Sequence, residues 1–553
     1  MASHSSTPTL AQAMAGACAA EGVRKVFALL GDGNMHLAAA LQDLACEFTY
    51  VRHEHCAVSA AMAYARVTGE LGVATLTCGP GLTQVMTALV AAVRARIGLV
   101  ILVGESPQGQ AWYNQELVQA PFVAACGATY LSVQEPRQLY PTLHQAFAQA
   151  RTQSCPVVVG VPFDLQESPW SLKTTYAPSL QWTSAQARVA PAGPAVAGAL
   201  AVIAKARRII VLAGRGVVLS GAREQCLALA ERLDALLATT LPARGLFAQE
   251  AFSLNVAGGF ASDAARRYFA QADLVIAVGT RLALHAADAG RLYPNAQVLH
   301  VDAQPLAWSQ GRVASQHQLA GDAKLCVQAL LDGLPEPRAT QWRIQETCQD
   351  IANSAIDAWT APDLQGKLDP RDVIQRLDAA LPKDWMMVNS SGHCSYYAAH
   401  MLGRAVEQFL TIREFGAIGN GLAYAIGAAV ARPDVPVVLF DGDGSFFMHV
   451  QELETIRRHR LKILVCVLND GGYGSEVHKL RADGISVDGA WFGHDDLAQV
   501  AHGFGLRAQQ VEDLNQLPAL IDTFARLEAG PMVLDFHVSD QVLSPVMRRV
   551  TQR

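Results

Sequence analysis

A chain of 553 residues is too long for one hydrophobic core, and about 150 residues per domain predicts three or four domains. With 51% hydrophobic and 17% charged residues the chain is not disordered overall, and its net charge of −6 offers no basic surface for nucleic acid. The 11 cysteines form no CxxC pair, which indicates free thiols in a reducing compartment, and no Lys or Arg precedes residue 21 to start a secretory or transit peptide. We therefore expect a soluble cytoplasmic protein without nucleic-acid or membrane partners.

The first predicted domain, residues 1–170, alternates helical and strand-like patterns. It begins with an Ala-rich helix over Ala11–Glu21, and its strands are apolar runs over Lys25–Leu30, Val73–Cys78, Leu99–Val103 and Pro156–Val161. Strands of this kind, interleaved with helices and apolar on both faces, predict a parallel α/β layer. The most apolar stretch, residues 85–103, contains Arg94 and Arg96, so it predicts a helix followed by a buried strand and not a membrane span.

Two polar stretches divide the rest of the chain. The first, residues 167–194, is a predicted linker before a second domain at 190–335, whose strands are Ile209–Ala213, Leu274–Val278 and Val298–Val301. The second, residues 334–370, precedes a third domain at 365–545, whose strands include Val435–Phe440 and Ile463–Leu468. The pattern predicts the α/β class, with three doubly wound parallel-sheet domains.

The turn after the strand Val435–Phe440 has the composition of a phosphate site. It reads Asp441-Gly442-Asp443-Gly444-Ser445 and opens a helix that we predict over Met448–Arg458. Glycines at a strand-to-helix turn let the backbone approach a phosphate, and the free N–H groups at a helix start bind it. An aspartate has the wrong sign for a bare phosphate, so the turn implies a cation between the two.

The next strand ends in a second turn of the same kind, Asn469-Asp470-Gly471-Gly472-Tyr473-Gly474. Neighbouring parallel strands bring both turns to the carboxyl edge of the sheet, where open α/β sheets bind ligands. Asp443, Asp470 and a backbone carbonyl near Gly472 are thus predicted to share one Mg²⁺ with phosphate oxygens and water, the oxygen-only shell that this ion prefers. Either turn alone is equally well explained as a simple turn, whereas the pair at this spacing favours the metal site.

Glu54 is a further candidate residue. It follows Arg52-His53 and precedes a helix of small residues predicted over Ala57–Ala65. A carboxylate there is compatible with two interpretations: a solvated acid that complements the dipole of a helix start, or a catalytic carboxylate in a dry site. The residues alone favour the first interpretation.

Together, these motifs resemble a known family. The sequences GDGS at residues 442–445, ND at 469–470 and RHEHCAVSAAMAYARVTG at 52–69 are similar to those of thiamine diphosphate enzymes of the pyruvate decarboxylase and acetolactate synthase superfamily. The resemblance covers essentially the whole chain and implies three domains in the order pyrimidine-binding, central and diphosphate-binding. It also implies thiamine diphosphate and Mg²⁺ as cofactors, and a homodimer or homotetramer with active sites between subunits.

The resemblance assigns roles to single residues. Glu54 would hydrogen-bond N1′ of the aminopyrimidine so that the 4′-imine removes the C2 proton, a task for a carboxylate with a raised pKa. Ile418 would wedge between the two rings of the cofactor, with the Gly416 carbonyl and the Ile418 amide on the pyrimidine edge. Asp443, Asp470 and Gly472 would hold the metal, and the remaining cofactor contacts would come from Ser391, Gly392, His393, Gly442, Gly444, Ser445, Tyr473 and Gly474.

Gln115 and His478 are weaker candidates for the substrate end of the site. Gln115 matches a glutamine that points at the substrate in the acetolactate synthase branch, whereas His478 is either substrate-facing or a histidine on a helix surface. His53 and His55, which flank Glu54, are less favoured as catalytic residues.

The branch of the family is indicated by both matches and departures. Gly79-Pro80-Gly81, Gln115 and Gly214-Arg215-Gly216 look most like acetolactate synthases, but a lysine expected near residues 124–127 is absent, and the flavin-contacting RFDDR-type stretch reads RLALH at 281–285. These departures argue against bound FAD and against a biosynthetic acetolactate role. We therefore expect a C–C lyase or transferase, a decarboxylase or carboligase acting on a 2-oxo acid. The alternatives are an acyloin lyase of benzaldehyde lyase type and, outside enzymes, a catalytically inactive cofactor-binding regulatory subunit.

Overall fold

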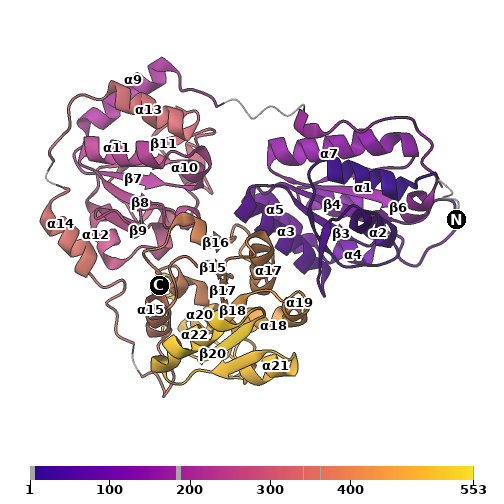
Figure 1. Ribbon diagram of the computed structural model, residues 1–553. Helices are drawn as coiled ribbons and strands as arrows, with labels where there is room; N and C mark the ends of the chain where they lie inside the picture. The colour runs from indigo at the N-terminus through magenta and orange to yellow at the C-terminus, as the bar shows by residue number, and fades with distance from the viewer. Residues whose placement is uncertain (1–6, 182–187, 341, 362, 552–553) are drawn as a thin grey trace.

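Three lobes, each built on a six-stranded parallel sheet, make up the computed structural model, which describes residues 7–181, 188–340, 342–361 and 363–551 (Figure 1). The predicted α/β class with three parallel sheets is confirmed. Residues 182–187 of the predicted linker lie outside the described residues. Within the described ranges, no helix combines the length and the apolar character needed to span a membrane.

The N-terminal sheet follows the predicted alternation of strands and helices. Its strands are β1 (Lys25–Ala28), β2 (Glu47–Tyr50), β3 (Gly72–Leu76), β4 (Leu99–Glu105), β5 (Thr129–Ser132) and β6 (Pro156–Pro162). They lie in the order β2-β1-β3-β4-β6-β5. The helices are α1 (Leu10–Ala20), α2 (Met35–Asp43), α3 (Glu54–Thr68), α4 (Pro80–Thr83), α5 (Met86–Ala95), α6 (Ala120–Ala125), α7 (Leu139–Gln153) and α8 (Phe163–Glu167). The apolar stretch at 85–103 folds as the predicted helix and buried strand, α5 and β4.

The central sheet has a different connectivity. Its strands are β7 (Ile209–Ala213), β8 (Leu236–Thr239), β9 (Ser253–Val256), β10 (Leu274–Val278), β11 (Gln297–Asp302) and β14 (His317–Ala320), beside a two-stranded antiparallel pair of β12 (Trp308–Ser309) and β13 (Arg312–Val313). The order β14-β11-β10-β7-β8-β9 is the doubly wound arrangement in which the chain starts at the middle of the sheet and fills each side in turn. Its helices are α9 (Gly193–Lys205), α10 (Arg215–Ser220), α11 (Arg223–Leu233), α12 (Asp263–Gln271), α13 (Ala323–Gly333) and α14 (Gln345–Asn353).

The C-terminal sheet repeats the connectivity of the N-terminal one. Its strands β15 (Met386–Asn389), β16 (Phe409–Thr411), β17 (Val437–Gly442), β18 (Ile463–Asn469), β19 (Arg507–Gln510) and β20 (Met532–His537) lie in the order β16-β15-β17-β18-β20-β19. Its helices are α15 (Pro370–Ala380), α16 (Cys394–Ala398), α17 (Gly421–Ala431), α18 (Asp443–Met448), α19 (Glu452–Arg458), α20 (Gly474–Ala482), α21 (Leu497–Gly503), α22 (Leu517–Arg526) and α23 (Pro545–Thr551).

One predicted helix is wrong. In place of a single helix over Met448–Arg458 the chain forms α18, a break at residues 449–451, and α19. His449 has non-helical backbone angles (φ −137°, ψ 35°), and its Nδ1 bonds the carbonyl of Gly419 at 2.7 Å. This tertiary contact overrides the local helix preference. The polar stretch at 334–370 likewise holds the helix α14.

The N-terminal and C-terminal sheets share one hydrophobic core, at whose centre α3 packs against α17 (Figure 1). Every residue of α3 from His55 to Ala65 is buried. A Cβ on Gly427 of α17 would lie 2.1 Å from the Ala60 carbonyl oxygen, so the two helices approach more closely than any side chain at that position allows. Small residues on both helices therefore join the two sheets within one chain.

Candidate active site

The predicted phosphate and metal residues line one pocket of about 370 Å³, called here the C-terminal pocket. It lies at the carboxyl ends of β15, β17 and β18, where the strand order reverses and open α/β sheets bind ligands. The predicted cofactor residues that line it are Ser391, Gly392, His393, Ile418, Gly442, Asp443, Gly444, Ser445, Asp470, Gly472, Tyr473 and Gly474. Among the described residues, the other candidates, Glu54, Gln115, Gly416 and His478, are not part of its lining.

Asp443 and Asp470 form a buried acidic pair in this pocket. Asp443 is 2% exposed, and neither of its carboxylate oxygens has a hydrogen-bond partner among the described residues. Burial and the charge of Asp470 raise the pKa of Asp443 well above its ordinary value, and burial raises the pKa of Asp470 to about 7. Two adjacent carboxyls, one of them without a hydrogen-bond donor, are stable as anions only with a cation between them, so the pair fits a hard divalent ion such as Mg²⁺.

A metal at this pair would need ligands other than side chains. In the part of the chain that the structure describes, no group of three or more His, Cys, Asp or Glu side chains could hold a metal ion. Gly472, whose carbonyl was the predicted third ligand, lines the same pocket. The donor set therefore suits an ion that completes its shell with a backbone carbonyl, phosphate oxygens and water.

Two glycines make room for the acidic pair and its surroundings. A Cβ on Gly474 would lie 2.1 Å from Asp470 Oδ2, and a Cβ on Gly444 would lie 2.7 Å from the Tyr473 ring. Real Cβ atoms do not approach other atoms so closely, so both positions require glycine. The absence of a side chain at both positions is typical of turns whose backbone approaches a phosphate.

The hydroxyl of Ser445 ties three loops of the pocket together. It lies 2.9 Å from the Ser390 hydroxyl and accepts the backbone N–H of Gly419 at 2.8 Å. Gly392 approaches the third loop as well, since its Cβ would lie 3.6 Å from Ile418 Cγ2. The loops after β15 and β17 and the segment before α17 are thus fixed relative to one another.

His393 is held inside the site, and His478 lies behind it. His393 Nε2 accepts the backbone N–H of Ser544 at 3.3 Å, while its Nδ1 lies 3.8 Å from Asp470 Oδ2. The His478 ring is edge-on to that of His393, with centres 4.7 Å apart, and it is 3% exposed. Burial lowers the pKa of His393 to about 4 and that of His478 to about 3. The alternative of a surface histidine at 478 is therefore wrong, because helix α20 packs this face inward against His393.

Sequence reasoning missed Glu476. This carboxylate lines the C-terminal pocket from the first turn of α20, and its Oε1 lies 3.1 Å from Lys479 Nζ on the helix surface. The signal was present in the sequence, because the residues that follow Gly474 begin a helix whose first turn faces the same edge of the sheet.

The N-terminal half of the site gathers Glu54, the turn at 79–81 and Gln115. Glu54 is the first residue of α3, half-buried, and burial raises its pKa. Its Oε1 lies 3.6 Å from the position that a Cβ on Gly81 would take, and a Cβ on Gly79 would lie 2.2 Å from the Gln115 carbonyl oxygen. Gln119 secures the turn by accepting the Gly79 N–H at 2.9 Å. These residues share the carboxyl edge of the N-terminal sheet, away from the lining of the C-terminal pocket.

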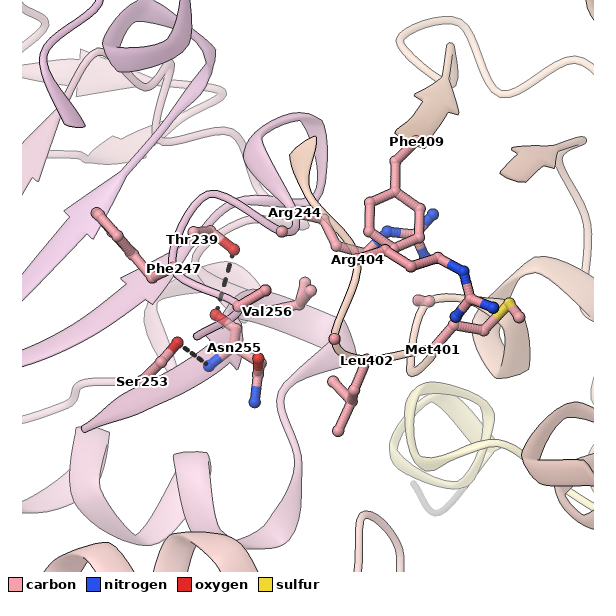
Figure 2. Close-up of a pocket in the computed structure, with 14 residues that line it drawn as sticks. Thr239, Arg244, Phe247, Ser253, Asn255, Val256, Met401, Leu402, Arg404 and Phe409 are labelled. Carbon is pink, nitrogen blue, oxygen red and sulfur yellow. Dashed lines mark hydrogen bonds between the residues drawn. The ribbon is translucent and has the colours of Figure 1, made fainter. Parts of the chain in front are cut away.

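A buried arginine links the central domain to the first loop of the C-terminal pocket. Arg244 donates to the Ala398 carbonyl at 2.7 Å and to Asn389 Oδ1 at 3.1 Å, and its guanidinium lies 3.8 Å from the centre of the Phe409 ring. Burial and the nearby Arg404 lower the pKa of Arg244 to about 9. Figure 2 shows Arg244 and Phe409 at a second pocket, of about 300 Å³, between the central and C-terminal domains. Because Asn389 directly precedes the loop after β15, the central domain positions that loop, a role that no sequence motif indicated.

Comparison with known proteins identifies the class. Three domain families of thiamine pyrophosphate enzymes match the chain. The N-terminal TPP binding domain matches residues 8–122, the central domain matches residues 196–330, and the C-terminal TPP binding domain matches residues 390–536. The chain is 30% identical over 550 residues to the acetolactate synthase isozyme 2 large subunit of Escherichia coli (strain K12), covering 97% of this chain and 96% of that protein. It is 26% identical over 564 residues to the probable acetolactate synthase large subunit of Methanococcus aeolicus (96% and 92% covered). It is also 29% identical over 533 residues to the probable 2-ketoarginine decarboxylase AruI of Pseudomonas aeruginosa (92% and 91% covered).

The chain therefore belongs to the thiamine pyrophosphate enzymes. Its N-terminal and C-terminal sheets carry the two TPP binding domains, and the matched order of three domains is the predicted one. It is a thiamine diphosphate-dependent enzyme of carbon–carbon bond chemistry, which confirms the enzymatic interpretation over the regulatory-subunit alternative.

Proposed function

We propose that this enzyme uses thiamine diphosphate with Mg²⁺ to decarboxylate a 2-oxo acid and to join the remaining acyl unit to a second carbonyl compound. The observation that carries the metal part is the buried, unpartnered carboxylate of Asp443 beside Asp470. The reaction class is supported by full-length relatives, which are named as acetolactate synthases and, in one case, as a decarboxylase.

The metal and the diphosphate would be held by the C-terminal pocket. Asp443, Asp470 and the Gly472 carbonyl are the proposed ligands of Mg²⁺, and the turn at 442–445 would present its N–H groups to the phosphates. The cation would offset part of the negative charge of the acidic pair and of the diphosphate, which otherwise repel each other. Ser391 and His393 would close the pocket from the loop after β15.

Glu54 would share a proton with the aminopyrimidine ring of the cofactor, a step on which the chemistry depends. When bound, thiamine diphosphate supplies a carbanion that attacks a carbonyl carbon and an electron sink for the bond that then breaks. The raised pKa of the half-buried Glu54 suits a carboxyl that shares a proton with N1′ of the aminopyrimidine. Gly416 and Ile418 are proposed to orient that ring, and Gln115 to face the substrate.

A complete site is proposed to need two copies of the chain. Glu54 is not part of the lining of the C-terminal pocket of its own chain, as far as the described residues go. Exposed apolar side chains flank both halves, with Trp112 and Val118 near Gln115, and Tyr473 and Phe492 at the C-terminal pocket. A second copy would cover these surfaces and bring its Glu54 to this pocket, in a homodimer or a homotetramer.

The proposed type of reaction is based on the positions at which the sequence differs from acetolactate synthases. The RLALH stretch at 281–285, which replaces a flavin-contacting sequence, supports an enzyme without FAD, so the purified protein is expected to be colourless. The second candidate, cleavage of an acyloin in the manner of a benzaldehyde lyase, requires the same carbanion and differs only in the bond that breaks.

A substrate panel tests the proposal. The purified protein, with added thiamine diphosphate and Mg²⁺, is incubated with 2-oxo acids of different side chains, alone and with an aldehyde, and in parallel with acyloins, and the products are identified by mass. Release of CO₂ with an aldehyde or a 2-hydroxy ketone as product supports the proposal. Cleavage of acyloins without turnover of any 2-oxo acid would replace it with the lyase alternative.

A further inference from the structure

Three histidines meet where the N-terminal and C-terminal domains of one chain join. The rings of His55, in α3, and of His449, in the break between α18 and α19, are stacked with centres 5.0 Å apart and planes 3° from parallel. His53 lies edge-on to His449, also at 5.0 Å, and its Nδ1 accepts the backbone N–H of His55 at 3.1 Å. His55 is 5% exposed and His449 is 8% exposed, so the stack is shielded from water.

The two stacked rings bind the end of the segment 416–420. His449 Nδ1 bonds the Gly419 carbonyl at 2.7 Å, and His55 Nε2 bonds the side-chain oxygen of Asn420. The Asn420 amide donates back to the carbonyl of residue 417 at 3.2 Å, which closes the segment on itself. Because Ile418 lines the C-terminal pocket, the two histidines fix the backbone that carries it.

The surroundings of the cluster favour neutral rings. Burial lowers the pKa of His55 to about 4, and it also lowers the pKa values of His53 and His449. In the described residues none of the three forms an ion pair with a carboxylate. Glu452 accepts the backbone N–H of Arg52 at 3.0 Å and the Thr455 hydroxyl at 2.6 Å. The charged groups on the elements around the rings are Arg52 before α3, Glu54 and Arg66 in α3, Asp441 in β17, Asp443 in α18, and Glu452, Glu454, Arg457 and Arg458 in α19.

We propose that His55 and His449 are positioning residues, which as neutral stacked rings hold the segment 416–420 in place and on protonation release it. A proton on either ring would place a buried charge beside another imidazole with no carboxylate to pair with it. The inference rests on the function proposed above, in which Gly416 and Ile418 orient the cofactor. It adds a dependence on pH that is separate from the titration of the metal ligands, because it acts through the segment 416–420.

Amide hydrogen exchange of residues 413–421 in the cofactor-free, full-length protein tests the proposal. The pKa of His55 is about 4 when the ring is held and about 6.5 when it is released. Protonation of His55 by itself should therefore make the segment open about tenfold more often near pH 5.5 than near pH 7.5, after correction for intrinsic exchange rates. The double variant His55→Gln/His449→Gln, which keeps polar side chains that cannot titrate, should lose this dependence. His502, an exposed histidine in the domain that holds His449, gives the matched control: His502→Gln should keep the wild-type response.

Two results of the hydrogen-exchange experiment would overturn the proposal. Protection of the segment that does not change with pH in the wild type, or a pH dependence that persists in the double variant, overturns the proposal. Where circular dichroism shows that the double variant does not fold, the single variants His55→Gln and His449→Gln are measured instead. Each should weaken the pH dependence, and an unchanged dependence in both overturns the proposal.

A titration with thiamine diphosphate and Mg²⁺ at both pH values separates this inference from the cofactor assignment. Because Asp470 also titrates in this range, the wild type is compared with the double variant. An affinity that falls more between pH 7.5 and pH 5.5 in the wild type than in the double variant supports both. Release of the segment with an unchanged affinity supports the role of the histidines and overturns that of Ile418 toward the cofactor.

Discussion

The N-terminal and C-terminal sheets have the same strand order and carry different chemistry at the same edge. In each, the second strand along the chain lies outside the first, and the fifth lies outside the sixth. The C-terminal edge holds two adjacent carboxyls, of which Asp443 has no hydrogen-bond donor among the described residues, whereas the N-terminal edge holds the single, half-buried Glu54 among small residues. The topology thus places a candidate ligand edge on each sheet, and a few loop residues give the two edges different chemistry.

The largest effect should follow from removing the acidic character of the C-terminal edge. Asp443→Ala leaves the diphosphate facing Asp470 without a firmly held cation, so the affinity for thiamine diphosphate should fall by more than the roughly 10–100-fold typical of a lost outer-shell metal partner. Calorimetric titration of the variant and of the wild type gives the comparison. Asp483→Ala, an exposed aspartate just after α20, should bind like the wild type. Unchanged cofactor affinity in wild-type protein stripped of divalent metal would contradict the assignment.

The corresponding change at the N-terminal edge should affect the proton and not the binding. Glu54→Gln keeps the volume and one hydrogen bond but cannot share a proton, so exchange of the C2 proton of bound cofactor into D₂O should slow on the order of 10²–10⁴-fold. Cofactor affinity should change only modestly, because the metal contacts remain. Quenched-flow NMR measures the exchange rate, with the exposed Glu47→Gln as the matched control. Equal rates in Glu54→Gln and wild type would leave Glu54 as an acid that merely complements the start of α3.

A smaller effect concerns the pH dependence of metal binding. Since burial raises the pKa of Asp470 to about 7, a proton must leave this carboxyl before Mg²⁺ can bind at lower pH. The Mg²⁺ affinity in the presence of thiamine diphosphate should therefore rise with pH by up to about tenfold per pH unit and level off above about 7. Titration calorimetry at several pH values measures this slope. Asp470→Asn should bind more weakly with a flatter profile, and a flat wild-type profile would show that the acidic pair does not hold the metal.

The smallest effect tests the joint between the two sheets. Gly427→Ala places a methyl group against the Ala60 carbonyl, so the free energy of unfolding should fall by about 1–3 kcal/mol, the usual cost of overpacking. Gly198→Ala in α9 has open space around its new methyl group and should raise stability by about 0.5–1 kcal/mol. Thermal midpoints of both variants, measured side by side, give the answer. A Gly427→Ala protein as stable as Gly198→Ala would mean that α3 and α17 are not closely packed in solution.

Much of this arrangement could be predicted from the sequence because it depends on local patterns. Apolar runs predicted strands of all three sheets, and the turns after β17 and β18 were expected at one edge, where both line the C-terminal pocket. The order of strands in a sheet depends little on the details of packing, because parallel strands joined by helical crossovers allow few arrangements.

The parts that could not be predicted depend on contacts between distant segments. The helix break at His449 follows from a bond to Gly419, and the burial of His478 follows from its contact with His393. Arg244 hydrogen-bonds Asn389, which is 145 positions away in the sequence, and no motif around either residue predicts this contact. Periodicity reports the face of an element that is buried, but it does not report the partner on the other side.

The close contact of α3 with α17 also bears on how such a chain arose. Both helices lie between the second and third strands of their sheets, so the two halves meet through equivalent elements, as the subunits of a symmetric dimer do. Fusion of two copies of one ancestral unit would leave this arrangement, with the central domain inserted between them. In this chain the two equivalent edges differ in their loop residues, with aspartates at 443 and 470 on one and the single glutamate at 54 on the other. The shared strand order thus makes the two halves comparable element by element, although their loop residues differ.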